Sequence, residues 1–498
     1  MRRAGILMPV FSLPSPYGVG TLGAAAREFI LFLEQAGQSC WQTLPLGPTG
    51  YGDSPYQSYS SYAGNHYLID LDELASQGLL LPEEYRNIQW STREGQVDYG
   101  KLYAHKTQVL RLAVTRLLAQ HRQAVEEFCQ RHHTWLEEYA LFMALKEEQG
   151  GAPWSMWPEP LRLRQPQALD QARQRLWEEV DFWRGVQYLF FRQWEQVKAF
   201  AHAHGVSIIG DLPIYVSLDS ADVWSAPGQF QLDENLVPTE VAGCPPDGFS
   251  ARGQLWGNPL FRWEEMAQDG YRWWVERIAF QFQLYDVLRI DHFRGFDQYY
   301  AIPYGSKDAR GGKWRPGPGL ALFQAVEQAI GKREIIAEDL GFLSDSVRQL
   351  VKDTGFPGMK VLELAFDSRD DSGWDYLPHR CTPNSVMYTG THDNSTILGW
   401  RDTAPEEDVA LAQRYFFLNE EEGWHWGMMR GAWSSVSDLA VMQMQDVLGL
   451  GDEARINTPS TLGENWQWRA WPGCFTPALA QRLRQAMALY GRLPCSGA

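Results

Sequence analysis

The sequence predicts an α/β fold in which eight parallel strands alternate with helices and close into a (β/α)8 barrel, the TIM barrel. Three observations support this fold class. Short apolar runs alternate with segments of helical periodicity along the chain. Several of the runs end in a carboxylate, at the strand ends where such barrels place their functional residues. No glycine-rich phosphate loop follows a strand, which disfavours the alternative, a doubly wound open sheet.

The predicted strands and helices follow one another in a regular order. The expected strands are residues 4–11, 39–46, 207–216, 287–294, 334–341, 359–365, 385–394 and 439–448. These runs are short and apolar, and turn residues such as Gly, Pro or Asp separate them from their neighbours. Periodicity predicts helices at residues 22–35, 185–204, 272–283, 320–330, 344–352 and 477–490.

Two long segments interrupt the strand rhythm, so we expect residues 1–498 to form a single barrel with large insertions after strands 2 and 3. Residues 74–184 are rich in Gln, Glu, Arg and Leu with helical spacing, and predict a mostly helical insertion. Residues 219–271 are rich in Pro, Gly and aromatics, and predict a loop-rich insertion at the barrel mouth. Residues 304–319 are expected to be a flexible loop. After the helix at 477–490 we expect no C-terminal β-sandwich.

Composition restricts the partners and the compartment. The net charge of −17 argues against nucleic acid and anionic membranes as partners. We expect no membrane span and no signal peptide, because no apolar run has the required length. The cysteines are scattered without paired spacing, so we expect reduced thiols and a cytoplasmic protein, without a disulfide frame or zinc site; they are Cys40, Cys129, Cys244, Cys381, Cys474 and Cys495.

Aromatic residues are unusually frequent. The chain has 22 Trp, 21 Tyr and 23 Phe. For any single Trp, packing in the core is the simpler explanation. The total nevertheless suits a sugar ligand, because flat rings stack on the C–H faces of sugars while nearby carboxylates bind their hydroxyl groups.

Four carboxylates lie at the predicted strand ends of one barrel mouth: Asp211, Asp291, Glu338 and Asp393. They have three possible roles, namely divalent metal binding, ion pairing with arginines such as Arg289, and glycosidic-bond chemistry. Arg289 lies two residues before Asp291, on the same strand face, and an arginine there favours an ionised aspartate. This pairing, a histidine directly before Asp393 and the aromatic loops favour sugar chemistry.

The motifs at these strand ends resemble the amylomaltase family, the 4-α-glucanotransferases or disproportionating enzymes of glycoside hydrolase family 77 in the α-amylase clan. They read DLPIYV from Asp211, RIDHFRGF from Arg289, IAEDLG from Ile336 and THDN from Thr391. Two loop motifs support the resemblance, GDSPYQS at residues 52–58 and GNP at residues 257–259. The resemblance extends from residue 6 to about residue 490.

The resemblance implies roles for individual residues. Asp291 matches the nucleophile, Glu338 the general acid/base, and Asp393 the third carboxylate, which binds sugar hydroxyls. Residues matching the substrate-binding positions are Tyr56, Asp211, Arg289 and His392 around the −1 sugar, Trp256 and Phe249 on the acceptor side, and Ser54 and Asn258 in the supporting loop motifs. Tyr51 and Tyr99 resemble a secondary glucan-binding pair. Gly248 stands where some relatives carry Tyr, so acceptor binding at that loop is expected to differ.

The implied reaction is transfer of α-1,4-glucan segments by a retaining double displacement, through a covalent glucosyl-enzyme on Asp291. Neither a cofactor nor a metal is expected. The expected ligands are maltooligosaccharides and glucans derived from amylose, starch or glycogen, and the expected assembly is a monomer or weak dimer. Three rivals stay open: an α-glucan hydrolase or branching enzyme of the same clan, an inactive glucan-binding protein, and a metal-dependent barrel hydrolase, which a chelator would inactivate.

Overall fold

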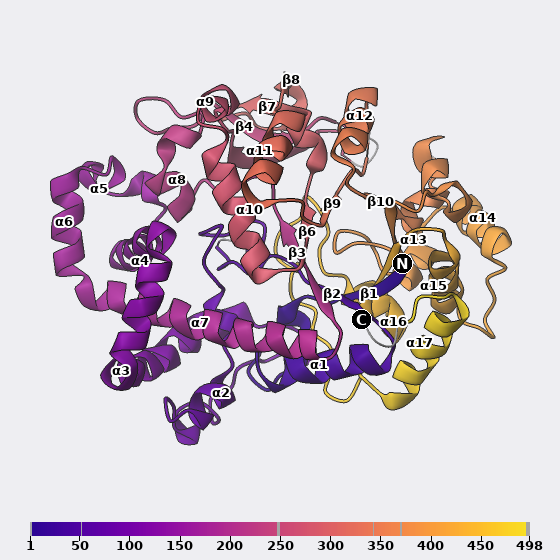
Figure 1. The fold of residues 1–498 in the computed structure, drawn as a ribbon, viewed down its shortest axis with the longest axis horizontal. Coiled ribbons are helices and arrows are strands. Elements are labelled where there is room, and N and C mark those ends of the chain that lie inside the picture. Colours follow the sequence, from indigo (N-terminus) through magenta and orange to yellow (C-terminus); the bar gives the residue numbers. More distant parts are fainter. Residues whose placement is uncertain (1, 51, 247–249, 342, 369–370, 495–498) are drawn as a thin grey trace.

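The computed structural model describes residues 2–50, 52–246, 250–341, 343–368 and 371–494. Eight parallel strands close into a barrel in the order β1-β12-β11-β10-β9-β6-β3-β2, which confirms the predicted TIM barrel (Figure 1). These strands are β1 (Arg3–Leu7), β2 (Cys40–Gln42), β3 (Ser207–Leu212), β6 (Val287–Ile290), β9 (Ile335–Ala337), β10 (Gly358–Val361), β11 (Ser385–Tyr388) and β12 (Leu439–Gln443).

The observed strands are shorter than the predicted ones, mainly at their carboxyl ends. The last part of the predicted fourth strand is a 3-10 turn, η6 (Phe293–Phe296), and the last part of the eighth is a helix, α16 (Met444–Leu448). Residues such as Phe293 and Val447 are buried in these turns and helices. Apolar character therefore continues past the end of the strand, and periodicity alone could not locate the boundary.

Helices surround the barrel, and α1 (Ala24–Gln35) packs beside the last helix, α17 (Pro477–Leu489), so that the two ends of the chain meet (Figure 1). Helix α1 buries one apolar face, including Phe29 and Leu33, against the barrel. The other helices of this layer are α7 (Trp177–Ala203), α10 (Arg272–Leu284), α11 (Leu320–Ile330), α12 (Asp345–Thr354), α13 (Ile397–Thr403), α14 (Glu406–Phe416) and α15 (Trp424–Ser434).

Helices fill the segment between β2 and β3. The long helix α3 (Tyr99–Arg131) begins where the carboxylate of Asp98 accepts a hydrogen bond from the Lys101 N–H at 3.2 Å, a standard N-cap. It packs with α7 and α4 (His133–Glu148) at one end of the molecule (Figure 1). The shorter helices here are α2 (Leu71–Ser76), α5 (Glu159–Arg162) and α6 (Pro166–Arg175).

A second, antiparallel sheet lies outside the barrel and was not predicted. Its order is β5-β4-β7-β8, with β4 (Glu240–Cys244), β5 (Gln254–Pro259), β7 (Gln298–Pro303) and β8 (Lys313–Pro316). The loop prediction was therefore wrong for β4 and β5 within 219–271 and for β8 within 304–319. Residues 219–271 also hold the helices α8 (Ala221–Ser225) and α9 (Trp263–Gln268). β4 pairs with β5, and β7 with β8, across short connections. The pairing of β4 with β7 joins segments far apart in the sequence, for example Val241 with Ile302, so no local pattern predicts the complete sheet.

The remaining features concern the core and the ends of the chain. Trp41, Trp194 and Trp433 are among the fully buried side chains, so much of the aromatic content packs the interior. Within residues 444–494 no further strand follows β12.

Among the described residues, none of the helices combines the length and apolarity that a membrane span requires.

Candidate active site

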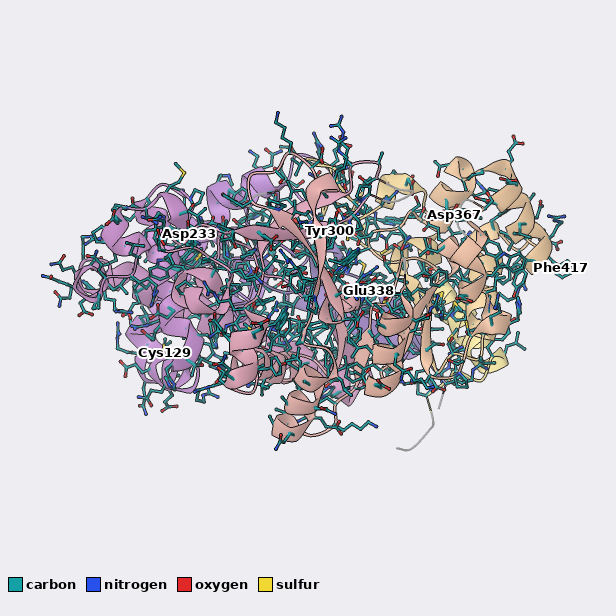
Figure 2. All side chains as sticks on the ribbon, turned by 90° about the horizontal axis from the view of Figure 1, so that it is seen from above. Cys129, Asp233, Tyr300, Glu338, Asp367 and Phe417 are labelled. Atoms are coloured by element: carbon teal, nitrogen blue, oxygen red, sulfur yellow. The ribbon has the colours of Figure 1, made fainter. Side chains whose placement is uncertain are left out.

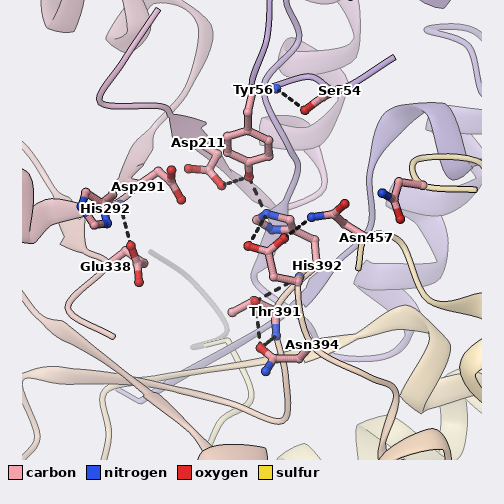
Figure 3. Close-up of polar contacts among 12 residues, drawn as sticks. Ser54, Tyr56, Asp211, Asp291, His292, Glu338, Thr391, His392, Asn394 and Asn457 are labelled. Atoms are coloured by element: carbon pink, nitrogen blue, oxygen red, sulfur yellow. Dashed lines mark hydrogen bonds and ion pairs between the residues drawn. The ribbon is translucent and has the colours of Figure 1, made fainter. Parts of the chain in front are cut away.

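The carboxyl ends of β3, β6 and β9 bring the charged residues together. Asp211 pairs with Arg289 in the β3–β6 register, and Arg289 pairs with Ile336 in the β6–β9 register. The ladder continues beyond the strands, because the Asp291 N–H donates to the Leu212 carbonyl and the Glu338 N–H to the Ile290 carbonyl, both at 3.0 Å. Asp291 and Glu338 therefore lie on adjacent strand ends (Figure 3).

This site lies in the middle of the long molecule. Figure 2 places Glu338 between the helical end that carries Cys129 and the opposite end that carries Phe417, with Tyr300 of the second sheet nearby in that view.

A buried arginine links two of the four carboxylates. Nη1 of Arg289 lies 2.6 Å from Oδ2 of Asp211 and 3.1 Å from Oδ1 of Asp291. The side chain of Arg289 is only 3% exposed, and that of Asp211 is fully buried. Burial lowers the pKa of Arg289, but the two aspartates outweigh it and raise the pKa well above its usual value. The guanidinium is therefore permanently charged beside Asp291.

Burial dominates the electrostatics of Asp291 and Glu338. It raises the pKa of Glu338, with a further rise from the charge of Asp291 and only partial opposition from Arg289. Burial also raises the pKa of Asp291, against the opposing effect of Arg289. Arg289 lowers the pKa of Asp291, as predicted, but the prediction overlooked the larger rise in this pKa that burial causes. Because Arg289 contacts Asp291 directly, the pair carries its proton on Glu338 and its charge on Asp291.

Backbone amides hold the carboxyl group of Glu338 in place. The His292 N–H donates to Oε2 at 2.5 Å, and the Leu340 N–H donates to Oε1 at 3.3 Å. His292 adopts a left-handed conformation with φ of 48°, uncommon for a residue with a side chain. This backbone geometry directs the amide of the residue after Asp291 toward Glu338, so one turn positions both carboxyl groups.

A stacked pair of rings covers the other side of the site. The rings of Tyr56 and His392 lie 4.9 Å apart and nearly parallel, and the Tyr56 hydroxyl donates to Oδ2 of Asp211 at 2.7 Å. His392 is 2% exposed, and burial lowers its pKa, so the imidazole is neutral at pH 7. Its Nε2 lies 3.4 Å from Oδ2 of Asp393. Tyr56 and His392 thus connect Asp211 with Asp393 (Figure 3).

Residues from the chain after β12 complete the site and were missed by sequence reasoning. Asn457 donates from Nδ2 to Oδ1 of Asp393 at 2.6 Å, and Arg455 donates to the Asp393 carbonyl at 2.7 Å. The ring of Trp466 lies 5.8 Å from that of Tyr56. No predicted strand ends in this segment, and its charged residues (Asp452, Glu453 and Arg455) together with its position after the eighth strand were the available signals.

Other predicted binding residues stabilise the loops around the site. Ser54 accepts a hydrogen bond from the Tyr56 N–H at 3.2 Å. Asn258 donates to the Val216 carbonyl at 2.8 Å, and its side-chain oxygen accepts from Gln57 at 3.2 Å. These contacts give Ser54 and Asn258 a structural role within the two loop motifs. Direct contacts of Ser54 and Asn258 with a sugar stay predictions.

The residues predicted for the acceptor side and for the secondary glucan site differ in where the structure places them. The ring of Trp256 meets the ring of His292 edge-on at 4.9 Å, beside Asp291 and Glu338. Phe249 and Tyr51 lie outside the described residues. Tyr99 is buried and donates its hydroxyl to the Trp466 carbonyl at 2.9 Å, an environment that does not favour stacking on a glucan. The secondary site stays a prediction.

The described residues hold no group of three or more His, Cys, Asp and Glu side chains arranged to bind a metal ion. The side chains at the barrel mouth offer a proton donor, an anionic carboxylate and oriented polar groups.

Comparisons with known proteins agree on one family. Residues 8–472 match the family model of glycoside hydrolase family 77, described as 4-alpha-glucanotransferase. The 4-alpha-glucanotransferase of Clostridium butyricum is 47% identical, over 97% of this chain and 100% of that protein. The enzyme of Thermus thermophilus is 48% identical, over 98% of each chain. The solved amylomaltase of Streptococcus agalactiae in complex with acarbose has a TM-score of 0.97 at 38% identity, covering 99% of this chain and 100% of that one.

Proposed function

The chain belongs to glycoside hydrolase family 77 and is a 4-alpha-glucanotransferase acting on α-glucans, and we propose that it works by a retaining double displacement through a covalent glucosyl-enzyme on Asp291. The family resemblance drawn from the strand-end motifs is thereby confirmed. The observation that carries the mechanism is the pair Asp291 and Glu338, half-buried on adjacent strand ends, of which only Asp291 directly contacts a permanent cation.

Glu338 acts first as an acid. It gives its proton to the glycosidic oxygen while a carboxylate oxygen of Asp291 attacks the anomeric carbon, so that one bond breaks as the other forms. Retaining enzymes need about 5–5.5 Å between these carboxyl groups, a spacing compatible with neighbouring strands about 4.8 Å apart. In the second step Glu338 accepts a proton from the 4-hydroxyl of an acceptor, whose oxygen displaces Asp291.

The surrounding groups favour the positively charged transition state. The carboxylate of Asp393 binds hydroxyls of the −1 sugar and stabilises developing positive charge. Neutral His392 and Tyr56 offer hydrogen-bonding groups beside it, supported by the Asp211–Arg289 pair. Because these partners are already in place, little reorganisation is needed when charge develops.

Transfer exceeds hydrolysis when the acceptor sugar displaces water from the site. Trp256, packed against His292, is suited to stack on an acceptor sugar next to Glu338. The proposed substrates are maltooligosaccharides and longer glucans from amylose, starch or glycogen. The acarbose bound to the Streptococcus agalactiae relative, together with that relative's TM-score of 0.97, supports oligosaccharide binding by this chain.

We also propose how the chain is divided into barrel and insertions, and how it assembles. Residues 74–184 and 219–271 are insertions into one catalytic barrel, and the protein is a monomer or weak dimer, which size-exclusion chromatography with light scattering tests. Cys40, Cys129, Cys381 and Cys474 are free cysteines, compatible with the predicted cytoplasmic location.

The experiment is incubation of the purified protein with maltotriose in the presence of a chelator, following glucose and longer oligosaccharides. The proposal expects a ladder of longer maltooligosaccharides alongside glucose, without a metal requirement. Glucose and maltose alone would instead identify water as the acceptor and the protein as a hydrolase. New α-1,6 linkages would indicate a branching enzyme.

A further inference from the structure

We propose that Asn457 is a positioning residue that fixes the carboxylate of Asp393 for the −1 sugar. The inference rests on the proposed function, in which Asp393 binds sugar hydroxyls. Asn457 reaches the site from the chain after β12, the side of the barrel where sequence motifs gave no candidate (Figure 3).

Asn457 holds both residues of the dipeptide His392–Asp393. Its Nδ2 donates to Oδ1 of Asp393 at 2.6 Å, and its backbone N–H donates to the carbonyl of His392 at 3.1 Å. One residue thus sets the path of the backbone and the rotamer of the carboxylate. The second oxygen of Asp393 keeps acceptor capacity for sugar hydroxyls.

Asp393 needs such a partner because packing does not fix its side chain. That side chain is 43% exposed, as a group that contacts substrate must be. The other described polar contact of its carboxylate is with His392, whose Nε2 lies 3.4 Å from Oδ2 and whose ring is neutral. The amide of Asn457 therefore gives the shortest described hydrogen bond to this carboxylate.

Arg455 makes the arrangement rigid. Its Nη2 donates to the Asp393 carbonyl at 2.7 Å and its Nε to the Asn457 carbonyl at 2.9 Å. Asp452 anchors the next part of the same loop by accepting from the Thr396 N–H at 3.1 Å. The side chain of Asn457 thus projects from a segment tied to the Asp393 loop at several points, and it loses little entropy in holding the carboxylate.

An amide is the appropriate donor here. A lysine or arginine at this position would orient Asp393 but would neutralise the negative charge that stabilises an oxocarbenium-like sugar. A neutral N–H orients the carboxylate and leaves its charge available to the substrate. The structure accordingly places the arginine of this segment on the backbone of Asp393 and the amide on its side chain.

The test is the isosteric variant Asn457→Asp, assayed by maltotriose disproportionation from pH 5 to pH 8. The change replaces the donor with a second carboxylate, so at pH 8 two like charges face each other and Asp393 is displaced. We expect kcat to fall by about 10- to 100-fold while KM changes less, because orientation affects the transition state most. As pH falls, a proton shared by the two carboxyl groups restores the hydrogen bond, and the ratio of variant to wild-type kcat rises.

Asn384→Asp is the matched control, because Asn384 is exposed before β11, at the opposite end of the barrel, and donates to the Gly355 carbonyl at 3.1 Å. It should keep wild-type kcat at every pH. Asn457→Ala, with its fold checked by near-UV circular dichroism, should lose kcat without recovery at low pH. If either Asn457 variant keeps wild-type kcat, with a ratio of variant to wild-type kcat that does not change with pH, this inference is wrong but the proposed function stands. Wild-type protein that makes no longer oligosaccharides overturns the proposed function as well.

Discussion

Arg289 and Asp211 form a buried ion pair, with Nη1 of the arginine 2.6 Å from Oδ2 of the aspartate. The pair lies beneath the reacting carboxylates, because the same Nη1 also contacts Asp291. Removing one partner of such a pair leaves a charge unpaired in a site shielded from water, which is more costly than losing an exposed ion pair.

Asp211→Asn should therefore lower both stability and activity. We expect a loss of about 3 kcal/mol in the free energy of unfolding, together with a fall in kcat/KM of at least 100-fold as Arg289 is drawn toward Asp291. Urea unfolding and maltotriose kinetics measure the two effects. Glu276→Gln, which breaks the exposed pair with Arg272, is the control and should leave stability and activity close to wild type. Equal effects in the two variants would mean that the buried pair has no special role.

The raised pKa of Glu338 predicts the alkaline side of the pH profile. Activity on maltotriose requires protonated Glu338, so it should decline as pH rises through that raised pKa. Glu338→Gln should abolish turnover of maltotriose. With α-maltosyl fluoride, whose leaving group needs no proton, the first step should proceed in the variant without the alkaline decline. Fluoride release followed against pH checks this, and an unchanged decline in the variant would assign the alkaline limb to another group.

The ring of Trp256 should control the choice between acceptor sugar and water. Trp256→Ala removes the surface that packs on His292, and we expect the ratio of transfer to hydrolysis to fall several-fold with little change in total donor cleavage. Chromatography of the maltotriose products gives both quantities. Trp177→Ala, at an exposed residue on α7, is the control. A Trp256 variant with the wild-type ratio would assign acceptor binding to other residues.

Asp446 links stability to pH through its burial beneath the Asp393 loop. It accepts hydrogen bonds from the Thr389 hydroxyl at 2.6 Å and the Ile397 N–H at 2.7 Å, and burial raises its pKa from 3.8 to about 7. Between pH 4 and pH 7, Asp446 is thus protonated in the folded state but ionised in the unfolded state. The stability that Asp446 contributes is therefore complete below pH 4 and declines as pH rises toward 7.

Asp446→Asn removes that dependence, so the variant should gain stability relative to wild type as pH rises from 5 to 8. The urea midpoints of unfolding at pH 5 and pH 8 measure this change in stability, with Asp353→Asn, at an exposed residue, as the control. A difference between variant and wild type that does not change with pH would show that Asp446 is ionised in the folded protein.

The barrel and its main carboxylates were predictable because strand periodicity and strand-end position are local signals. Asp291 and Glu338 follow apolar runs, and barrel geometry then brings the strand ends together. The assembly of the second sheet was not predictable, since its two halves join through the β4–β7 pairing, in which only the fold brings Val241 and Ile302 together. Asn457 was missed for the same reason, because it reaches Asp393 across 64 residues of chain. The effect of burial on Asp291 also required the structure, since a sequence shows the neighbouring arginine but not the loss of water.

The covalent glucosyl-enzyme on Asp291 is the central claim, and trapping it is the most direct test. Glu338→Gln protein is mixed with α-maltosyl fluoride without acceptor, and intact mass spectrometry is followed by peptide mapping. The Glu338 variant should form the adduct but lack the base that helps its turnover. We expect a mass increase of one maltosyl group, located on Asp291 and absent from an Asp291→Asn, Glu338→Gln double variant. Rapid fluoride release without any adduct, or an adduct on another residue, would contradict the mechanism.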